Sequence, residues 1–139
     1  AELEHERYCK FEHFSGSTLE LEDEPGLSLE RVFDAIENPL QIEEIRLNKM
    51  KLENLPESIA RFSALQYLSL EKNRLNEIPA VLSRFEQLEH LDLSNNRIVT
   101  DGDQLVLLKH LTYLDLQGTI KIKRGWIPRL ERRGLTIRR

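Results

Sequence analysis

Cysteine is nearly absent from this sequence. Among its 139 residues only Cys9 is a cysteine, which excludes an intramolecular disulfide and favours a reducing compartment. Long apolar runs are absent too, because the longest, Leu105 to Leu108, has four residues and is far too short to cross a membrane. We therefore expect a cytoplasmic protein, with the length of one domain that buries its own core.

Charge of both signs is plentiful but unevenly distributed. The net charge is −4, yet residues 1–40 carry eleven acidic against three basic residues, whereas residues 117–139 carry eight basic residues against Glu131 alone. A basic C-terminal end could bind an anionic surface, either nucleic acid or membrane. Since the overall pI is acidic and no known nucleic-acid motif accompanies these bases, we favour a solvated cap and keep the anionic surface as the alternative.

One pattern recurs through the middle of the chain. The spacing L-x-x-L-x-L, with isoleucine in part of the first copy, begins at Ile42, Leu65, Leu88 and Leu111, always 23 residues apart. A single copy could not hide these apolar side chains from water. Successive copies must therefore stack side by side around one continuous core.

Two asparagines occupy the same position of their copies. Asn73 and Asn96 stand where the chain turns away from the predicted strand. A buried amide can satisfy the backbone groups that such a turn leaves open, because it has both donors and an acceptor. We therefore predict a structural role for both side chains.

Less regular segments flank and interrupt the copies. The alternation in Leu19-x-Leu21 predicts a strand, and Ser28 could cap a helix over residues 29–37. A helical segment is also predicted over 104–110, and a last short strand over 135–137. These end segments are expected to cover the open ends of the stacked core.

Three possible zinc ligands lie near the N-terminus. His5, Cys9 and His13 follow one another at four-residue intervals. Glu12 is nearby, but a structural zinc site usually takes four ligands from defined pairs, and one cysteine with two histidines can occur together by chance in a terminal segment. We therefore predict neither a metal site nor a cofactor.

The region from Ile42 to Thr119 resembles leucine-rich repeat proteins of the typical 23-residue type, which are common in bacteria and in intracellular signalling scaffolds. The resemblance implies an α/β fold, a solenoid that forms a short curved arc. Its concave face would carry a parallel β-sheet, and its convex face short helical or 3-10 segments. Residues 1–41 would then be an N-terminal cap with a degenerate first repeat, 42–119 the repeats, and 120–139 a basic C-terminal cap. The resemblance also implies a non-enzymatic role in protein–protein recognition.

In that geometry the residues between the leucines face outward on the concave sheet, and equivalent positions form rows across the strands, about 4.8 Å apart. Tyrosine is enriched at interface hot spots, and aspartates select basic partners, although aromatic residues also simply suit exposed strands. We predict a partner-binding site made of two rows, the first being Glu44, Tyr67, His90 and Tyr113 and the second Arg46, Ser69, Asp92 and Asp115.

An enzyme is the opposing hypothesis. His90 with an aspartate would supply part of a catalytic triad, but neither Ser69 nor Ser94 lies in a nucleophile-elbow sequence. An open sheet also excludes water poorly. We therefore predict no enzymatic activity. We also predict a monomer whose partner is another protein, and not a small molecule, nucleic acid or membrane.

Overall fold

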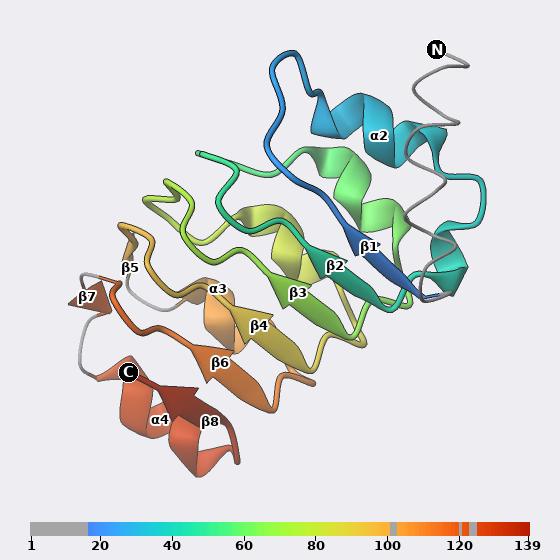
Figure 1. Cartoon of the computed structure of the whole chain (residues 1–139). Coiled ribbons are helices and arrows are strands. Elements are labelled where there is room, and N and C mark those ends of the chain that lie inside the picture. Colours follow the sequence, from blue (N-terminus) through green and yellow to red (C-terminus); the bar gives the residue numbers. More distant parts are fainter. Residues whose placement is uncertain (1–16, 101–102, 120, 123–124) are drawn as a thin grey trace.

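The computed structural model describes residues 17–100, 103–119, 121–122 and 125–139. Within these residues six strands form one parallel sheet, and they neighbour each other in chain order (Figure 1). The strands are β1 (Thr18–Glu20), β2 (Glu44–Arg46), β3 (Tyr67–Ser69), β4 (His90–Asp92), β6 (Tyr113–Asp115) and β8 (Thr136–Arg138). Two further short strands, β5 (Val99–Thr100) and β7 (Lys121–Ile122), pair separately.

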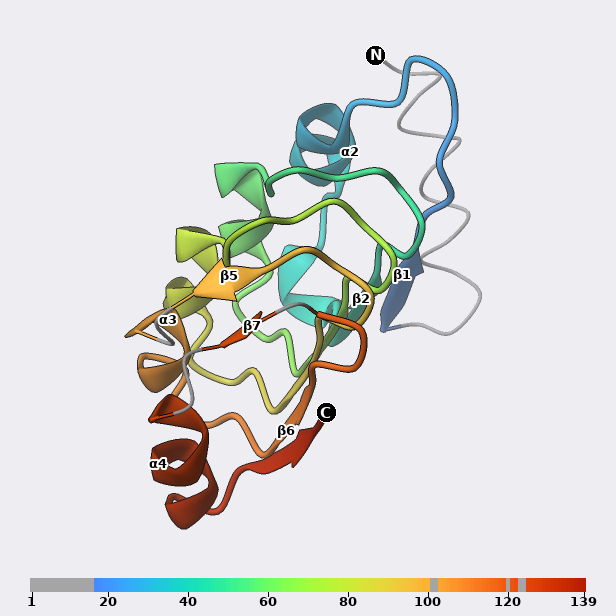
Figure 2. The same cartoon turned by 90° about the vertical axis from the view of Figure 1, so that its left-hand side faces the viewer.

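Short helices form the second layer. Figure 2 shows them along one side of the molecule, with the sheet along the other. They are α2 (Leu29–Ala35), the 3-10 helices η1 (Pro39–Gln41), η2 (Glu57–Arg61) and η3 (Ala80–Arg84), then α3 (Asp103–Val106) and α4 (Trp126–Arg132). This arrangement confirms the predicted α/β solenoid with its open parallel sheet. The sheet face turned away from the helices is called the concave face below.

The strands pair at the repeat period. Tyr67 of β3 lies opposite His90 of β4, which lies opposite Tyr113 of β6, so each residue pairs with the residue 23 positions later. The ladder runs on past the strands, because the N–H of Leu70 donates to the carbonyl of Asp92 at 2.8 Å and that of Leu93 to Asp115 at 2.9 Å. The sequence period is therefore the spatial register of the sheet.

The repeated apolar residues form one core between the two layers. Ile45, Leu68, Leu91 and Leu114, at the centres of four successive strands, are all 0% exposed. The helical side closes the core with a second buried set, which comprises Ile59, Phe62, Leu82, Phe85, Leu105 and Leu108. Burial of a side chain of this size stabilises the fold by roughly 1.5–3 kcal/mol, and no single repeat could achieve it alone.

The two repeat asparagines are buried and hydrogen-bonded, as predicted. The amide oxygen of Asn73 accepts from the backbone N–H of Met50 at 2.9 Å, and its amide nitrogen donates to the carbonyls of Leu47 at 2.8 Å and Leu70 at 2.9 Å. Asn96 repeats the arrangement one turn later, donating to the same Leu70 carbonyl at 2.9 Å. Each asparagine therefore joins the backbone of two adjacent repeats.

Two helices are shorter than the sequence predicts. The helix after Ser28 ends at Ala35 and not near residue 37, and the one expected over 104–110 ends at Val106. In both cases an arginine from the next turn donates to one carbonyl within the end of the helix and to one just beyond it. Arg61 donates to the carbonyls of Phe33 and Ile36, and a second guanidinium, that of Arg133, donates to those of Val106 at 3.2 Å and Leu108 at 2.9 Å. These helices end where the neighbouring repeat supplies the donors.

No helix in the described part of the chain is long and apolar enough to span a membrane.

Replacing Asn96 by alanine should lower the free energy of unfolding by at least about 2 kcal/mol. The substitution removes the acceptor of the buried Leu75 N–H and the donor to the buried Leu93 carbonyl, and each unsatisfied buried group costs about 1–3 kcal/mol. Urea unfolding followed by circular dichroism measures the difference. Asn76→Ala is the matched control, because Asn76 is exposed, and its change should stay within about 0.5 kcal/mol. Equal losses in the two variants would contradict the structural role of Asn96.

Candidate functional site

Three rings form a stack across the middle of the concave face. The ring centroids of Tyr67 and His90 lie 4.5 Å apart at an interplanar angle of 26°, and those of His90 and Tyr113 lie 4.4 Å apart at 17°. The stack follows from the register, because equivalent residues of neighbouring parallel strands lie about 4.8 Å apart. Tyr67, His90 and Tyr113 are called the ring row below.

The two ends of the ring row differ. At one end the guanidinium of Arg46 lies over the Tyr67 ring, 5.0 Å from its centroid, and is also 3.6 Å from the Glu44 carboxylate. At the other end Tyr113 lies beside Thr136 of β8. The first predicted row of site residues is therefore assembled as expected, with Glu44 and Arg46 at one end of the rings.

The second predicted row is assembled too, but two of its members lie deep. Ser69 is 2% exposed and donates its hydroxyl to the Asn48 amide oxygen at 2.6 Å. Asp115 is 7% exposed, and one of its oxygens accepts from the backbone N–H of Gln117 at 3.0 Å. The corresponding oxygen of Asp92 accepts from the N–H of Ser94 at 2.9 Å. Each aspartate thus has one oxygen engaged in a turn.

The sequence analysis missed residues that extend both rows. β8 brings Thr136 beside Tyr113 and Arg138 beside Asp115, and the Arg138 guanidinium lies 4.0 Å from the Asp115 carboxylate. At the opposite edge β1 adds Thr18 beside Glu44 and Glu20 beside Arg46. The 23-residue spacing from Asp115 to Arg138 was the available signal, whereas β1 departs from that period.

Burial shifts the pKa values of two of the rings, those of His90 and Tyr67. Burial lowers the pKa of His90 from 6.5, although the nearby Asp92 and Asp115 carboxylates act in the opposite direction. Burial likewise raises the pKa of Tyr67 above 10.0, with Arg46 opposing. At neutral pH His90 and Tyr67 are therefore predominantly uncharged, and their polar edges can still form hydrogen bonds.

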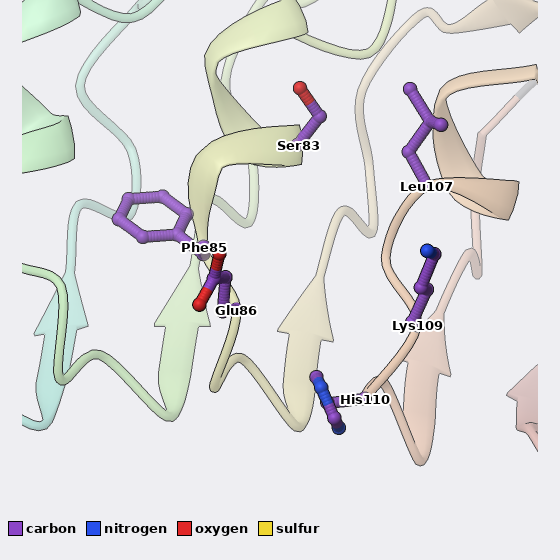
Figure 3. Close-up of a pocket in the computed structure, with 6 residues that line it drawn as sticks. All are labelled: Ser83, Phe85, Glu86, Leu107, Lys109 and His110. Atoms are coloured by element: carbon purple, nitrogen blue, oxygen red, sulfur yellow. The ribbon is translucent and has the colours of Figure 1, made fainter.

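Two open cavities are lined by residues outside the ring row. Figure 3 shows the larger, of about 480 Å³, where Ser83 and Leu107 lie on either side of the space and Phe85 points away from it. Its lining is completed by Glu86, Lys109 and His110. The smaller, of about 280 Å³, shares Glu86 and His110. Neither cavity lining contains a cysteine, and Ser83 already donates to the carbonyl of Ala80 at 2.8 Å.

The possible zinc ligands His5, Cys9 and His13 lie outside the described residues. Across the part of the chain that is described, no three histidine, cysteine or acidic residues are grouped so that they could hold a metal ion.

The basic C-terminal segment is largely engaged with the protein itself. Arg129 lies over the Trp126 ring at 4.7 Å, and Arg139 pairs with Glu131 at 2.9 Å. Arg133 and Arg138 are held by the contacts given above. Most of the described arginines in this segment therefore have partners within the chain.

Comparison with known proteins places these features in context. Residues 41–98 match the model of the leucine rich repeat family. The chain is similar to the solved structure of a leucine-rich repeat protein of Leptospira interrogans, with 28% sequence identity and a TM-score of 0.60. That similarity covers 70% of this chain and 25% of the other, so the chain spans about a quarter of that protein's length. No curated protein sequence matches significantly. Leucine-rich repeat folds commonly serve as protein-interaction modules, and neither similarity indicates a catalytic family.

The state of His90 can be tested by titration. Since its pKa is lowered on folding, the folded protein binds fewer protons than the unfolded chain as the pH falls below 6.5. The stability associated with neutral His90 is therefore full above pH 6.5 and is lost as the pH falls through the folded-state pKa. Proton NMR of the ring should give a midpoint below 6.5, and His90→Gln should lose stability less steeply than wild type over this interval. A midpoint at or above 6.5 would show that the Asp92 and Asp115 carboxylates outweigh burial, and would contradict a predominantly neutral ring at neutral pH.

Proposed function

Because the chain is a leucine-rich repeat protein, we propose that it is a non-enzymatic interaction module that binds another protein through its concave face. The observation that carries the proposal is the ring row. Tyr67, His90 and Tyr113 are only half-buried, although their rings stack closely on one another. Such rings are already ordered before a partner arrives, so little side-chain entropy is lost on binding.

The surrounding residues support the same surface. Glu44, Arg46, Asp92 and Asp115 place charges of both signs beside the rings, which gives an aromatic centre with a charged surround. Interfaces are built in this way, with aromatic anchors for affinity and charges for the choice of partner. Ser69 lies beneath this surface, where its buried hydroxyl donates to the Asn48 amide oxygen.

Catalysis has less support on the concave face. His90 is stacked between two tyrosines, and the Ser69 hydroxyl donates to Asn48. A nucleophile needs a base within hydrogen-bond reach, and Ser69 and His90 do not form such a hydrogen-bonded pair. We therefore propose that the protein has no enzymatic activity of its own. We further propose a cytoplasmic location, because the single cysteine suits a reducing compartment, and we propose that the protein is a monomer.

Binding of an anionic surface through the C-terminal segment is the weaker candidate. Arg138 is paired with Asp115 and Arg139 with Glu131, while Arg133 is bonded to two backbone carbonyls. An anion would have to compete with these contacts. The segment is better explained as a cap that closes the end of the core.

Affinity capture from lysate of the source organism tests the proposal. Wild type should retain a protein that a Tyr67→Ala, Asp92→Ala, Tyr113→Ala variant, shown by circular dichroism to be folded, fails to retain. The matched control carries Ser83→Ala, Glu86→Ala and Lys109→Ala on the larger cavity and should retain it as wild type does. Loss of the partner from the control variant alone would place binding away from the concave face and contradict the proposal.

A further inference from the structure

The second row of the concave face has short side chains in its middle and long ones at both sides. Ser69, Asp92 and Asp115 lie between Arg46 and Arg138 in one continuous register. Ser69 and Asp115 are nearly buried, so neither projects far above the sheet. A side chain from a partner can therefore come close to the sheet here, between the two arginines.

The charges in this row are not balanced at its centre. Glu44 is paired with Arg46 at 3.6 Å, and Asp115 with Arg138 at 4.0 Å. Among the described residues no basic side chain forms an ion pair with Asp92. One of its carboxylate oxygens accepts from the N–H of Ser94, and the other accepts no hydrogen bond from these residues. The site is therefore complementary to a cation and repels a carboxylate.

The adjoining ring row suits a planar cation in particular. The protein already places one guanidinium on it, that of Arg46 over Tyr67 at 5.0 Å. A guanidinium combines a flat surface for rings with a fork of donors for a carboxylate, whereas an ammonium supplies only a point charge.

We propose that the partner carries a basic side chain, arginine in preference to lysine, on an extended segment that lies along the two rows. This inference rests on the proposed function. This side chain enters between Arg46 and Arg138, pairs with Asp92 and lies against the ring row. An extended segment fits because the rows run straight across neighbouring strands of an open sheet. Asp92 thus selects for a basic partner, while Tyr67 and Tyr113 supply contact area.

A display library of random linear twelve-residue peptides, selected on the wild-type protein, is the test. The enriched peptides should share an arginine or lysine. Their affinity, measured by fluorescence anisotropy, should fall about tenfold in Asp92→Asn, a loss of about 1.4 kcal/mol of binding free energy. Asparagine keeps the oxygen that accepts from Ser94, so the fold is maintained. The matched control, Asp34→Asn on the exposed side of α2, should bind within twofold of wild type.

Replacing the shared arginine by citrulline removes the charge and keeps the shape. Citrulline should cost about tenfold on wild type and almost nothing on Asp92→Asn, because the two changes remove the same contact. Peptides without a shared basic residue, or binding to Asp92→Asn within twofold of wild type, would overturn the inference. If such peptides still lost binding to Tyr67→Ala, the concave face would stand as the binding surface with a different chemistry. A selection that enriches no peptide would overturn the inference of an extended basic segment.

Discussion

The pairing of each strand residue with the residue 23 positions later is the constraint on which the other features depend. It stacks Ile45, Leu68, Leu91 and Leu114 into one core column with 0% exposure. The same register lets Asn73 and Asn96 bond to the backbone of the preceding repeat, and it brings Tyr67, His90 and Tyr113 into ring contact. A slip of one residue would turn the rings into the core and the leucines into water. Core and candidate site are therefore two faces of one arrangement.

The register also imposes local strain. Lys49, Lys72 and Asn95, each 23 residues from the next, have φ values of 57°, 58° and 56°, in the left-handed region that costs a non-glycine residue roughly 1–2 kcal/mol. The ladder holds all three directly. The N–H of Lys49 donates to the Glu71 carbonyl at 2.9 Å, that of Lys72 to Ser94 at 3.0 Å and that of Asn95 to Gln117 at 2.7 Å. Gly118 ends the series with φ 70°, and a Cβ there would clash with the Asn95 amide oxygen. These backbone bonds hold the strained residue at the same position of successive repeats.

The regular part of the fold could be predicted from the sequence because its determinants are local and periodic. The strand positions, the buried leucines, the structural asparagines and the two rows all follow from the 23-residue spacing. The helix ends could not be predicted in the same way, because Arg61 and Arg133 act across repeats to satisfy the carbonyls of Ile36 and Leu108.

Within the candidate site, the membership of the rows was predictable and their depth was not. The Ser69 side chain is held close to the sheet by its hydrogen bond to Asn48, a partner that the 23-residue period does not identify. Arg138 was missed because Gly134 and Arg139 replace leucines in the last repeat, although the spacing from Asp115 continues. Pattern thus identifies which residues share a face, and side-chain contacts decide which of them a partner can reach.

Amide NMR of the ¹⁵N-labelled protein, titrated with the protein retained by affinity capture, tests the central claim most directly. The account predicts that the resonances that shift most belong to β3, β4 and β6, including the N–H of Ser94 that donates to Asp92. Those of η2, η3 and α4 should change little. Shifts concentrated in these helices, with the three strands unaffected, would contradict the assignment of the concave face as the binding surface.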